Sequence, residues 1–386
     1  MIFDYFQKIR LRKRVWEDIK KLKNKKGYLK AGLPRYNRLF GRDSLISAWQ
    51  LLDKNPGISK ATLEILSQYQ GKVVNNEREE EPGKILHETD FEKSRHPQSY
   101  FPFPYYGSID STPLFLILFS FYYQRTGDIK FLDSHWKNIL MALNWIEEYG
   151  DKDKDLFLEY QRKNEKGLFH QAWKDGFEDN LKIEPPVAMV EVQGYQYLAL
   201  AEISQLAKEK NNFELSKKLE ERARKLKEKF NHKFWMEDEN FFVLALDAKK
   251  QQKKAITSNP GHLLFTGIID KDKVNFVVQR LFQKDIWTNY GIRTHSKKEP
   301  DFDPLSHQLG AIWPHDNWII SQGLKKLGYK KEYLKIKKAI LRAYQEIGFA
   351  PEFYGVINEK LTLKLKKPAC YLQAWSSGAI FNFLSS

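Results

Sequence analysis

The sequence has a single cysteine, Cys370, among its 386 residues, so an intramolecular disulfide is excluded and a reducing compartment fits. Long hydrophobic runs are also missing. The longest candidate, residues 114–123, falls short of the roughly 18 apolar residues that span a bilayer. The first residues lack the apolar stretch of a signal peptide. We therefore expect a cytoplasmic protein without a membrane-spanning segment.

Several catalytic signatures are absent as well. The nine histidines form no HExxH motif, and there is neither a glycine-rich phosphate loop nor a GxSxG elbow. Residues 151–155 (DKDKD) begin like a calcium loop, but Leu156 stands where that loop needs glycine and Arg162 where it needs glutamate. We expect no metal and no cofactor, with calcium at 151–155 as the alternative.

Basic residues outnumber acidic ones by 64 to 49, which gives a net charge of +15. Such an excess is typical of proteins that bind nucleic acid. The lysines, however, are interleaved with glutamates along the outer faces of predicted helices, as at Lys217 and Lys218. We expect a solvated basic surface and no nucleic-acid partner. A helical nucleic-acid binder is the alternative, and it would show a steep salt dependence of binding.

Helical periodicity dominates the chain. Its length exceeds the roughly 250–300 residues that one core usually serves, but a ring of helices can spread its core around the ring. Strand signals are sparse, the best being residues 240–246. The expected helices lie near residues 2–24, 43–54, 59–70, 111–126, 129–149, 187–210, 212–234, 258–269, 271–283, 314–328, 330–347 and 371–384.

Four long segments without helical period separate these helices: residues 71–110, 150–186, 284–313 and 348–370. Long loops in a compact domain are usually functional or disordered, and these contain many aromatic, acidic and glycine residues. The pattern predicts an all-α protein, an (α/α)6 barrel of six helical hairpins whose long loops line a pocket at one end. A helical solenoid is the alternative, but the unequal loops do not fit regular repeats.

Aromatic residues make up 14% of the chain, with 10 Trp, 19 Tyr and 26 Phe. Aromatic faces stack on sugar rings and on unpaired bases. They cluster with polar groups in four places: residues 32–44 (GLPRYNRLFGRDS), 171–180 (QAWKDGFEDN), 312–318 (IWPHDNW) and 351–355 (PEFYG) followed by 371–375 (YLQAW). Helix capping by Asp43, Ser44, His315 or Asp316 is the structural alternative to sugar binding in the first and third clusters.

Two carboxylates stand out in these clusters. Asp175 lies between Trp173 and Gly176, where loss of solvation raises the pKa of a carboxyl and suits it to donate a proton. Glu178 and Asp179 are its local competitors. Glu352 lies among aromatics in a loop between the last two helices and is the candidate base; a solvated loop glutamate is the alternative.

Taken in order, the clusters resemble the amylo-α-1,6-glucosidase family, the glucosidase half of glycogen-debranching enzymes, within the glucoamylase-like (α/α)6 hydrolases. The resemblance covers about residues 28–384. The matching segments are AGLPRYNRLFGRDSLISA (31–48), EPGKILHE (81–88), YYGSIDSTPLF (105–115), LFLEYQR (156–162), QAWKDGFEDN (171–180), VEVQGYQY (190–197), NPGHLLFTGI (259–268), WTNYGIRTHS (287–296), IWPHDN (312–317), PEFYGV (351–356) and ACYLQAW (369–375).

The resemblance implies an inverting α-glucoside hydrolase in which Asp175 is the general acid and Glu352 the general base, with no cofactor. Inversion needs the two carboxyls about 6.5–9.5 Å apart, so they should come from different loops. The expected substrate-binding residues, some from the resemblance and some from the aromatic clusters, are Arg42, Asp43, Tyr36, Asp110, Trp173, Glu191, Gln193, His315, Asp316, Gln373 and Trp375.

The chain also departs from that family. We expect residues 1–386 to form one catalytic domain, without the family's β-rich N-terminal domain and without the transferase half of debranching enzymes. Arg35 stands where the family commonly has an aromatic, and Gly176 replaces a serine. The predicted substrate is therefore an oligosaccharide or a small α-glucoside, with linkage and oligomeric state left open. The alternative is a carbohydrate-binding or small-α-glucoside-specific relative, of sucrose, trehalose or glucosylglycerate type, with weak or no turnover of polysaccharide.

Overall fold

A computed structural model of the chain describes residues 5–93 and 101–385. The predicted helical segments are confirmed with ends that differ by a few residues, except that the segment predicted at 258–269 is a 3-10 helix (Asn259–His262) followed by a four-residue α-helix. The start of predicted helix 2–24 and residues 94–100 of the segment 71–110 lie outside the described residues. The helices are α1 (Tyr5–Leu22), α2 (Gly41–Leu51), α3 (Pro56–Gln68), α4 (Ser111–Thr126), α5 (Ile129–Trp145), α6 (Val190–Glu209), α7 (Phe213–Lys233), α8 (Leu263–Thr266), α9 (Lys271–Leu281), α10 (Pro314–Lys326), α11 (Lys330–Ile347) and α12 (Ala374–Ser385).

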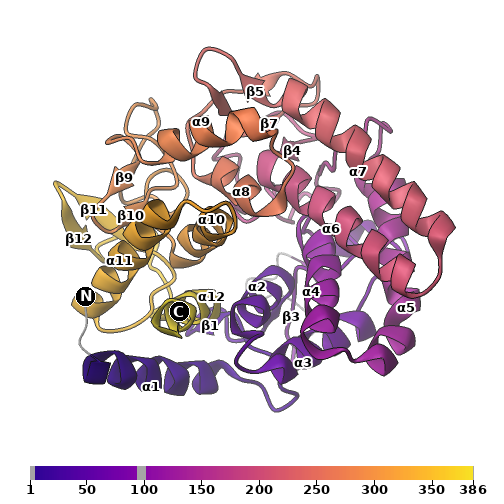
Figure 1. The fold of residues 1–386 in the computed structure, drawn as a ribbon, viewed down its shortest axis with the longest axis horizontal. Helices are drawn as coiled ribbons and strands as arrows, with labels where there is room; N and C mark the ends of the chain where they lie inside the picture. The colour runs from indigo at the N-terminus through magenta and orange to yellow at the C-terminus, as the bar shows by residue number, and fades with distance from the viewer. Residues whose placement is uncertain (1–4, 94–100, 386) are drawn as a thin grey trace.

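The even-numbered helices form a closed inner ring. In sequence order each packs on the next, from α2 through α4, α6, α8 and α10 to α12, and α12 packs on α2. The odd-numbered helices lie outside this ring (Figure 1), with α1 against α12, α3 against α2 and α7 against α6. This arrangement is the predicted (α/α)6 barrel.

The alternation of inner and outer helices decides where the long loops lie. Each outer helix runs back along the barrel before the next inner helix begins, so the inner helices are parallel and start at the same end. The polar motifs sit at these starts: Arg42 is the second residue of α2, Glu191 the second of α6 and His315 the second of α10. One end of the ring therefore collects the polar and aromatic clusters.

Short strands tie the loops together at this end. β1 (Gly32–Leu33) pairs with β13 (Leu372–Gln373), which joins the segment before α2 to the segment before α12 and closes the ring. β2 (Leu39–Phe40) pairs with β3 (Glu88–Thr89). The remaining strands are β4 (Ala188–Met189), β5 (Trp235–Met236), β6 (Phe241–Phe242), β7 (Ala245–Leu246), β8 (Gln252–Lys253), β9 (Trp287–Thr288), β10 (Gly291–Ile292), β11 (Gly355–Ile357) and β12 (Lys360–Thr362). The strand predicted at residues 240–246 is confirmed as β6 and β7.

The longest apolar run belongs to an inner helix. Residues 114–119 in α4 are all buried, because α4 packs against α2, α3, α5 and α6. A helix that is apolar on all sides is one that neighbours surround. In the described part of the chain, no helix has the length and apolar character needed to cross a membrane.

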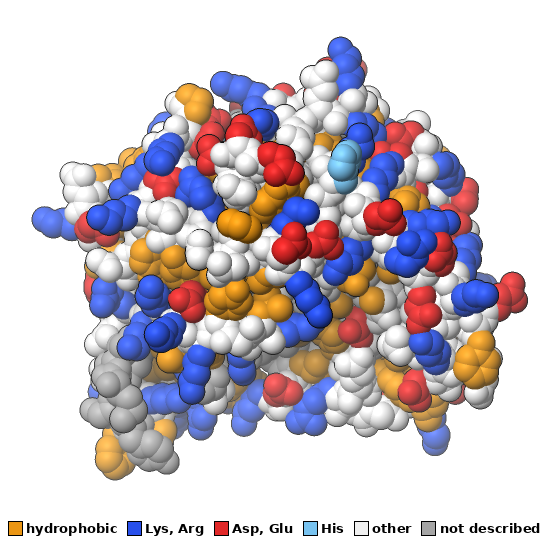
Figure 2. Space-filling model, turned by 45° about the horizontal axis from the view of Figure 1, so that its top comes forward, with side chains coloured by type: hydrophobic (Ala, Val, Ile, Leu, Met, Phe, Trp, Pro, Cys, Tyr) orange, Lys and Arg blue, Asp and Glu red, His pale blue; other side chains and the backbone are white. Residues whose placement is uncertain are grey.

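The surface carries charges of both signs. On the face drawn in Figure 2, Lys and Arg side chains are interspersed with Asp and Glu and do not gather into one basic area. Ion pairs such as Lys218 with Glu147 at 2.8 Å and Arg224 with Glu221 at 2.8 Å connect these exposed groups. This distribution agrees with the predicted solvated basic surface; the absence of a nucleic-acid partner stays a prediction.

Candidate active site

A pocket of about 420 Å³ opens at the loop end of the barrel. Eight of the thirteen residues predicted from the sequence line it, and they come from loops and helix starts spread over the whole chain. These eight are Tyr36, Arg42, Asp43, Trp173, Asp175, Glu352, Gln373 and Trp375. The other five, Asp110, Glu191, Gln193, His315 and Asp316, do not line it and are completely buried behind it.

Asp175 lies on a tight turn in which His170 and Gly176 form an antiparallel bridge. Its carboxylate oxygen Oδ2 accepts a hydrogen bond from Nη1 of Arg42 at 2.9 Å, and a third of its side chain (33%) stays exposed to the pocket. Loss of solvation raises the pKa of Asp175, and the positive charge of Arg42 opposes this effect. The predicted direction of the shift is confirmed, whereas the contact with Arg42 was not predicted.

Glu352 lies on a different loop, directly before β11. Its Oε2 accepts a hydrogen bond of 3.0 Å from the backbone N–H of Cys370, and its own N–H donates to the Cys370 carbonyl at 2.9 Å. Burial raises the pKa of Glu352 to about 7, although the Cys370 N–H and the charges of Lys367 and Arg35 act in the opposite direction. Glu352 is only 7% exposed, so the alternative of a solvated loop glutamate is wrong.

Arg42 connects the pocket to the barrel interior. Besides Asp175, its guanidinium binds Asp110 (Nε to Oδ2, 2.6 Å) and the carbonyl of Gln171 (3.3 Å). Burial alone would lower the pKa of this side chain, but the two carboxylates raise it, so Arg42 is fully charged. Asp110 thus contacts Arg42 and not the pocket, which corrects its predicted place in the pocket lining.

Asp43 is held by a residue from the other end of the chain. Nε2 of Gln373 donates to Oδ1 of Asp43 at 2.9 Å, across the junction of α2 and α12. Burial raises the pKa of Asp43 well above its ordinary value. The capping alternative is wrong for both candidates in α2, because Phe40 occupies the cap position without a side-chain bond and the Ser44 hydroxyl donates to the Leu29 carbonyl at 2.7 Å.

The other predicted binding residues that do not line the pocket form a buried polar layer under it, and their role in substrate binding stays a prediction. Asp316 accepts a hydrogen bond from Nε2 of His262 at 2.7 Å, and the His315 ring stacks on Trp375 with 3.7 Å between centroids. Gln193 binds backbone groups of Leu158 at 2.9 Å. These side chains lie deeper than predicted because the inner helices continue the barrel core up to the pocket floor. They support Trp375 and the loops around it.

Several polar atoms in and beside this layer have no hydrogen-bond partner in the described part of the chain, and those of Glu191 are one example. Both of its carboxylate oxygens are buried and have no hydrogen-bond partner among the described residues. Both nitrogens of His315 and the indole nitrogens of Trp173 and Trp375 are also buried without a hydrogen-bond partner among the described residues. Buried polar atoms of this kind normally bind water or a ligand. The layer under the pocket, together with the lining residues Trp173 and Trp375, therefore holds polar atoms suited to bind water or hydroxyl groups.

Sequence reasoning missed thirteen further lining residues. They are Arg38, Phe40, His87, Leu168, Gly176, Phe177, Glu178, Asn180, His307, Gln308, Trp313, Lys367 and Glu88. Most lie within the motif segments given above, for example His87 and Glu88 in EPGKILHE, so the sequence indicated their region but not the individual residues. His307 and Lys367 lie outside every motif, and nothing in the sequence marked them.

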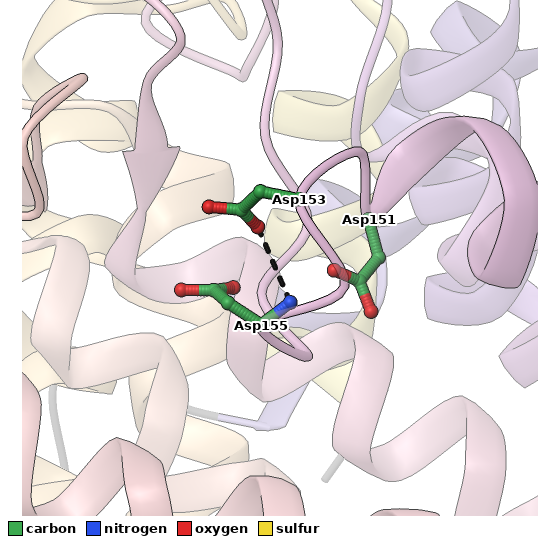
Figure 3. A group of neighbouring side chains, drawn as sticks. All are labelled: Asp151, Asp153 and Asp155. Carbon is green, nitrogen blue, oxygen red and sulfur yellow. Dashed lines mark hydrogen bonds between the residues drawn. The ribbon is translucent and has the colours of Figure 1, made fainter.

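The acidic residues 151–155 lie away from this pocket, after the end of α5 (Figure 3). One carboxylate oxygen from each of Asp151, Asp153 and Asp155 falls within 4.8 Å of the others. Basic side chains already contact these groups: Arg222 binds Asp151 at 2.9 Å, and Lys250 binds Asp153 at 3.0 Å. The chain itself thus supplies positive charge to the group considered as a calcium loop.

Comparison with known proteins identifies the family. Residues 36–361 match the family described as the mannosylglycerate hydrolase MGH1-like glycoside hydrolase domain. The mannosylglycerate hydrolase of Rubrobacter radiotolerans is 26% identical over 139 residues, 35% of this chain and 31% of that protein. Mannosylglycerate hydrolase MGH1 of Selaginella moellendorffii is 33% identical over 66 residues, 17% of this chain and 14% of that protein. Both alignments span less than a third of the relative's length.

Solved structures share the fold over almost the full chain. The GH63 mannosylglycerate hydrolase of Thermus thermophilus in complex with Tris has a TM-score of 0.75 at 14% identity, covering 97% of this chain and 99% of that chain. Its complex with glucose also has a TM-score of 0.75, at 15% identity, covering 97% and 100%. At such identities the likeness supports the barrel fold alone.

These findings refine the resemblance predicted from the sequence. The prediction of an (α/α)6 glycoside hydrolase is confirmed. The narrower assignment to amylo-α-1,6-glucosidases is replaced, because the match over residues 36–361 is to a different glycoside hydrolase family, one whose named members act on a small glycoside. The chain belongs to the mannosylglycerate hydrolase MGH1-like family of glycoside hydrolases.

Proposed function

We propose that this protein hydrolyses a small α-hexoside with inversion of configuration, with Asp175 as general acid and Glu352 as general base. The observation that carries the proposal is the position of two carboxyl groups on separate loops of one pocket. Each has its own hydrogen-bond partner, Arg42 for Asp175 and the Cys370 N–H for Glu352. Inversion needs room for a water between substrate and base, and separate hydrogen-bond partners on separate loops support such an arrangement.

The proposed reaction follows from these positions. Asp175 donates its proton to the glycosidic oxygen as the bond to the anomeric carbon breaks, and the aglycone leaves as an alcohol. Glu352 takes a proton from a water that attacks the opposite face of the same carbon. The sugar leaves as the β-anomer, and proton exchange with solvent returns both carboxyls to their starting states. The raised pKa of Asp175 favours the protonated form that this role needs.

The size and depth of the pocket support a small substrate. A volume of about 420 Å³ above a buried polar layer at the helix starts suits one hexose and a compact aglycone. The relatives of Rubrobacter and Selaginella are named for the hydrolysis of mannosylglycerate. We propose a glyceric acid glycoside of mannose or glucose as the substrate, and the α-1,6-glucan stub of debranching enzymes as the lesser candidate.

A substrate panel tests the proposal. Release of free hexose would be measured from mannosylglycerate, glucosylglycerate, maltose, isomaltose, panose, trehalose and sucrose. We expect the two glycerate glycosides to exceed the disaccharides in kcat/KM by at least tenfold. Proton NMR of the first product should show the β-anomer. Preferential cleavage of isomaltose or panose would restore the debranching-type assignment, and an α-anomer formed first would refute inversion. Binding without product would indicate a carbohydrate-binding relative.

A further inference from the structure

Lys367 is a positive charge at the pocket that forms no ion pair with any of the described residues. It belongs to the segment between β12 and β13, lines the pocket and is exposed to solvent. Its neighbour Lys366 differs in this respect, because it forms an ion pair with Asp303. In the described part of the chain no carboxylate is paired with Lys367. The ammonium group is therefore free to bind a ligand.

The field of Lys367 reaches the groups proposed for catalysis. Burial is the largest influence on the pKa of both Asp175 and Glu352, and the charge of Lys367 lowers both values against it. The pKa of His307, another lining residue, falls to about 3 through burial and then through Lys367. His307 is therefore neutral near pH 7, and Lys367 is the charged group on this side of the pocket.

Arg35 brings a second cation to the same region. It is exposed, lies 5.8 Å above the ring of the lining residue Tyr36, and acts on the carboxyl of Glu352. Lys367 thus lines the pocket itself, and Arg35 lies beside the lining residue Tyr36.

This distribution of charge constrains the substrate. The acidic side chains that line the pocket are Asp43, Glu88, Asp175, Glu178 and Glu352, and two of the lining cations are already paired, Arg38 with Glu88 and Arg42 with Asp175. An anionic ligand therefore needs a further cation near its negative group. A neutral oligosaccharide, in contrast, would gain little from an unpaired ammonium. The unpaired ammonium group of Lys367 therefore indicates a ligand that carries a negative charge.

We propose that Lys367, assisted by Arg35, binds a carboxylate on the aglycone and makes the enzyme selective for acidic glycosides over neutral ones of the same shape. The proposal rests on the hydrolytic function proposed above and adds the residue that recognises the negative charge of the aglycone. Lys367 contacts the departing group and takes no part in proton transfer. Its loss should therefore raise KM for an acidic substrate more than it lowers kcat.

Paired substrates separate charge recognition from catalysis. Glucosylglycerate and mannosylglycerate would be compared with glucosylglycerol and mannosylglycerol, in which a hydroxymethyl group replaces the carboxylate. For the Lys367→Gln variant we expect the ratio of kcat/KM between acidic and neutral substrates to fall about tenfold, the value of one charge-assisted hydrogen bond. The Arg35→Gln variant should lower the same ratio less. Lys366→Gln is the matched control, because Lys366 is already paired with Asp303.

The outcomes distinguish the two proposals. Wild-type protein that cleaves none of the four glycosides would contradict both the proposed function and this inference. Hydrolysis with the same acidic-to-neutral ratio in wild type and Lys367→Gln would overturn the inference alone. Inhibition by free D-glycerate gives a second readout: its inhibition constant should rise about tenfold in Lys367→Gln and stay unchanged in Lys366→Gln. Equal inhibition of wild type and Lys367→Gln would also count against the assignment.

Discussion

Arg42 holds Asp175 through a hydrogen bond of 2.9 Å from Nη1 to Oδ2, while Nε of the same guanidinium binds Asp110 at 2.6 Å. One buried cation thus joins the barrel interior to the proposed general acid. The contact favours the ionised form of Asp175, and burial favours the protonated form. The proton-donating state of Asp175 depends on the balance between these two effects.

The Arg42→Lys variant tests this connection. A lysine keeps the charge but lacks the planar fork that binds two carboxylates at once. We expect kcat/KM to fall by roughly 100-fold, about 2.7 kcal/mol of transition-state stabilisation. The melting temperature should also fall by several degrees, because Asp110 is completely buried and loses its partner. Both quantities can be measured by steady-state kinetics and calorimetry.

Arg125→Lys is the control for this variant. Arg125 pairs with Asp53 at 3.0 Å, but both side chains are more than half exposed, so the pair contributes little to stability. Activity and melting temperature should match wild type. If Arg42→Lys behaved like Arg125→Lys, the proposed dependence of Asp175 on Arg42 would be wrong.

Glycosyl fluorides can assign the two carboxyl roles separately. Fluoride leaves without protonation, so a variant without the general acid should still hydrolyse an α-hexosyl fluoride of the preferred sugar. We expect Asp175→Asn to retain fluoride hydrolysis within about tenfold while its activity on the natural type of glycoside falls at least 1000-fold. Glu352→Gln should lose both activities, because water activation is still needed. If Glu352→Gln retained fluoride hydrolysis and Asp175→Asn lost it, Glu352 would be the acid and Asp175 the base.

The pH dependence of the rate follows from Glu352. A base must be ionised, and burial raises the pKa of Glu352 to about 7. We expect kcat/KM to decrease below pH 7 with a slope of one proton, and to decrease at high pH as the acid loses its proton. Removal of the nearby charge in Lys367→Gln should move the acidic limb to higher pH. A rate independent of pH between 5 and 7 would contradict this role for Glu352.

The same group should affect folding. Because the pKa of Glu352 is higher in the folded state (about 7) than its ordinary 4.5, the folded protein binds more protons than the unfolded chain between these values. Its contribution to the free energy of unfolding is complete below pH 4.5 and is lost as the pH rises through 7. The loss amounts to roughly 3.5 kcal/mol at most.

Glu352→Gln removes this dependence while keeping an acceptor for the Cys370 N–H. We expect the variant to gain stability relative to wild type as the pH rises from 4.5 to 8, as measured by denaturant unfolding at several pH values. The test is the difference in the free energy of unfolding between the two proteins at each pH. The pH dependence of either protein alone is not sufficient, because other acidic groups such as Glu81 have lowered pKa values and act in the opposite sense. A constant difference across this range would exclude the effect.

The sequence predicted the fold well because helical periodicity and loop length determine it. It also placed Asp175, Glu352, Arg42 and Asp43, since each lies in a polar cluster at the start of an inner helix or in a long loop. It could not separate a residue on the pocket floor from one a layer below, as with Trp375 and His315. The depth of a side chain below the pocket depends on how the inner helices pack around the ring, and a sequence motif does not determine this packing.

Two other features also escaped the sequence. The bond between Arg42 and Asp175 joins residues 133 positions apart, and no local pattern predicts such a pairing. Lys367 lies in a segment rich in lysine that resembles an ordinary surface loop. Only its position at the pocket indicates a role in ligand binding. The single-domain organisation of residues 1–386 stays a prediction.

Two glycines near the site should respond differently to substitution. At Gly41, the first residue of α2, an added Cβ would lie 2.2 Å from the Leu86 carbonyl oxygen and 2.8 Å from the Ser111 hydroxyl. Backbone cannot move away cheaply, so Gly41→Ala should displace the start of α2 and Arg42 with it. At Gly176 the nearest atom would be 3.6 Å away, an ordinary contact. Gly176→Ser should therefore keep the melting temperature within about one degree, whereas Gly41→Ala should lower it by several degrees and remove most activity. Equal melting temperatures for the two variants would show that the contacts of α2 with Leu86 and Ser111 are looser than their distances indicate.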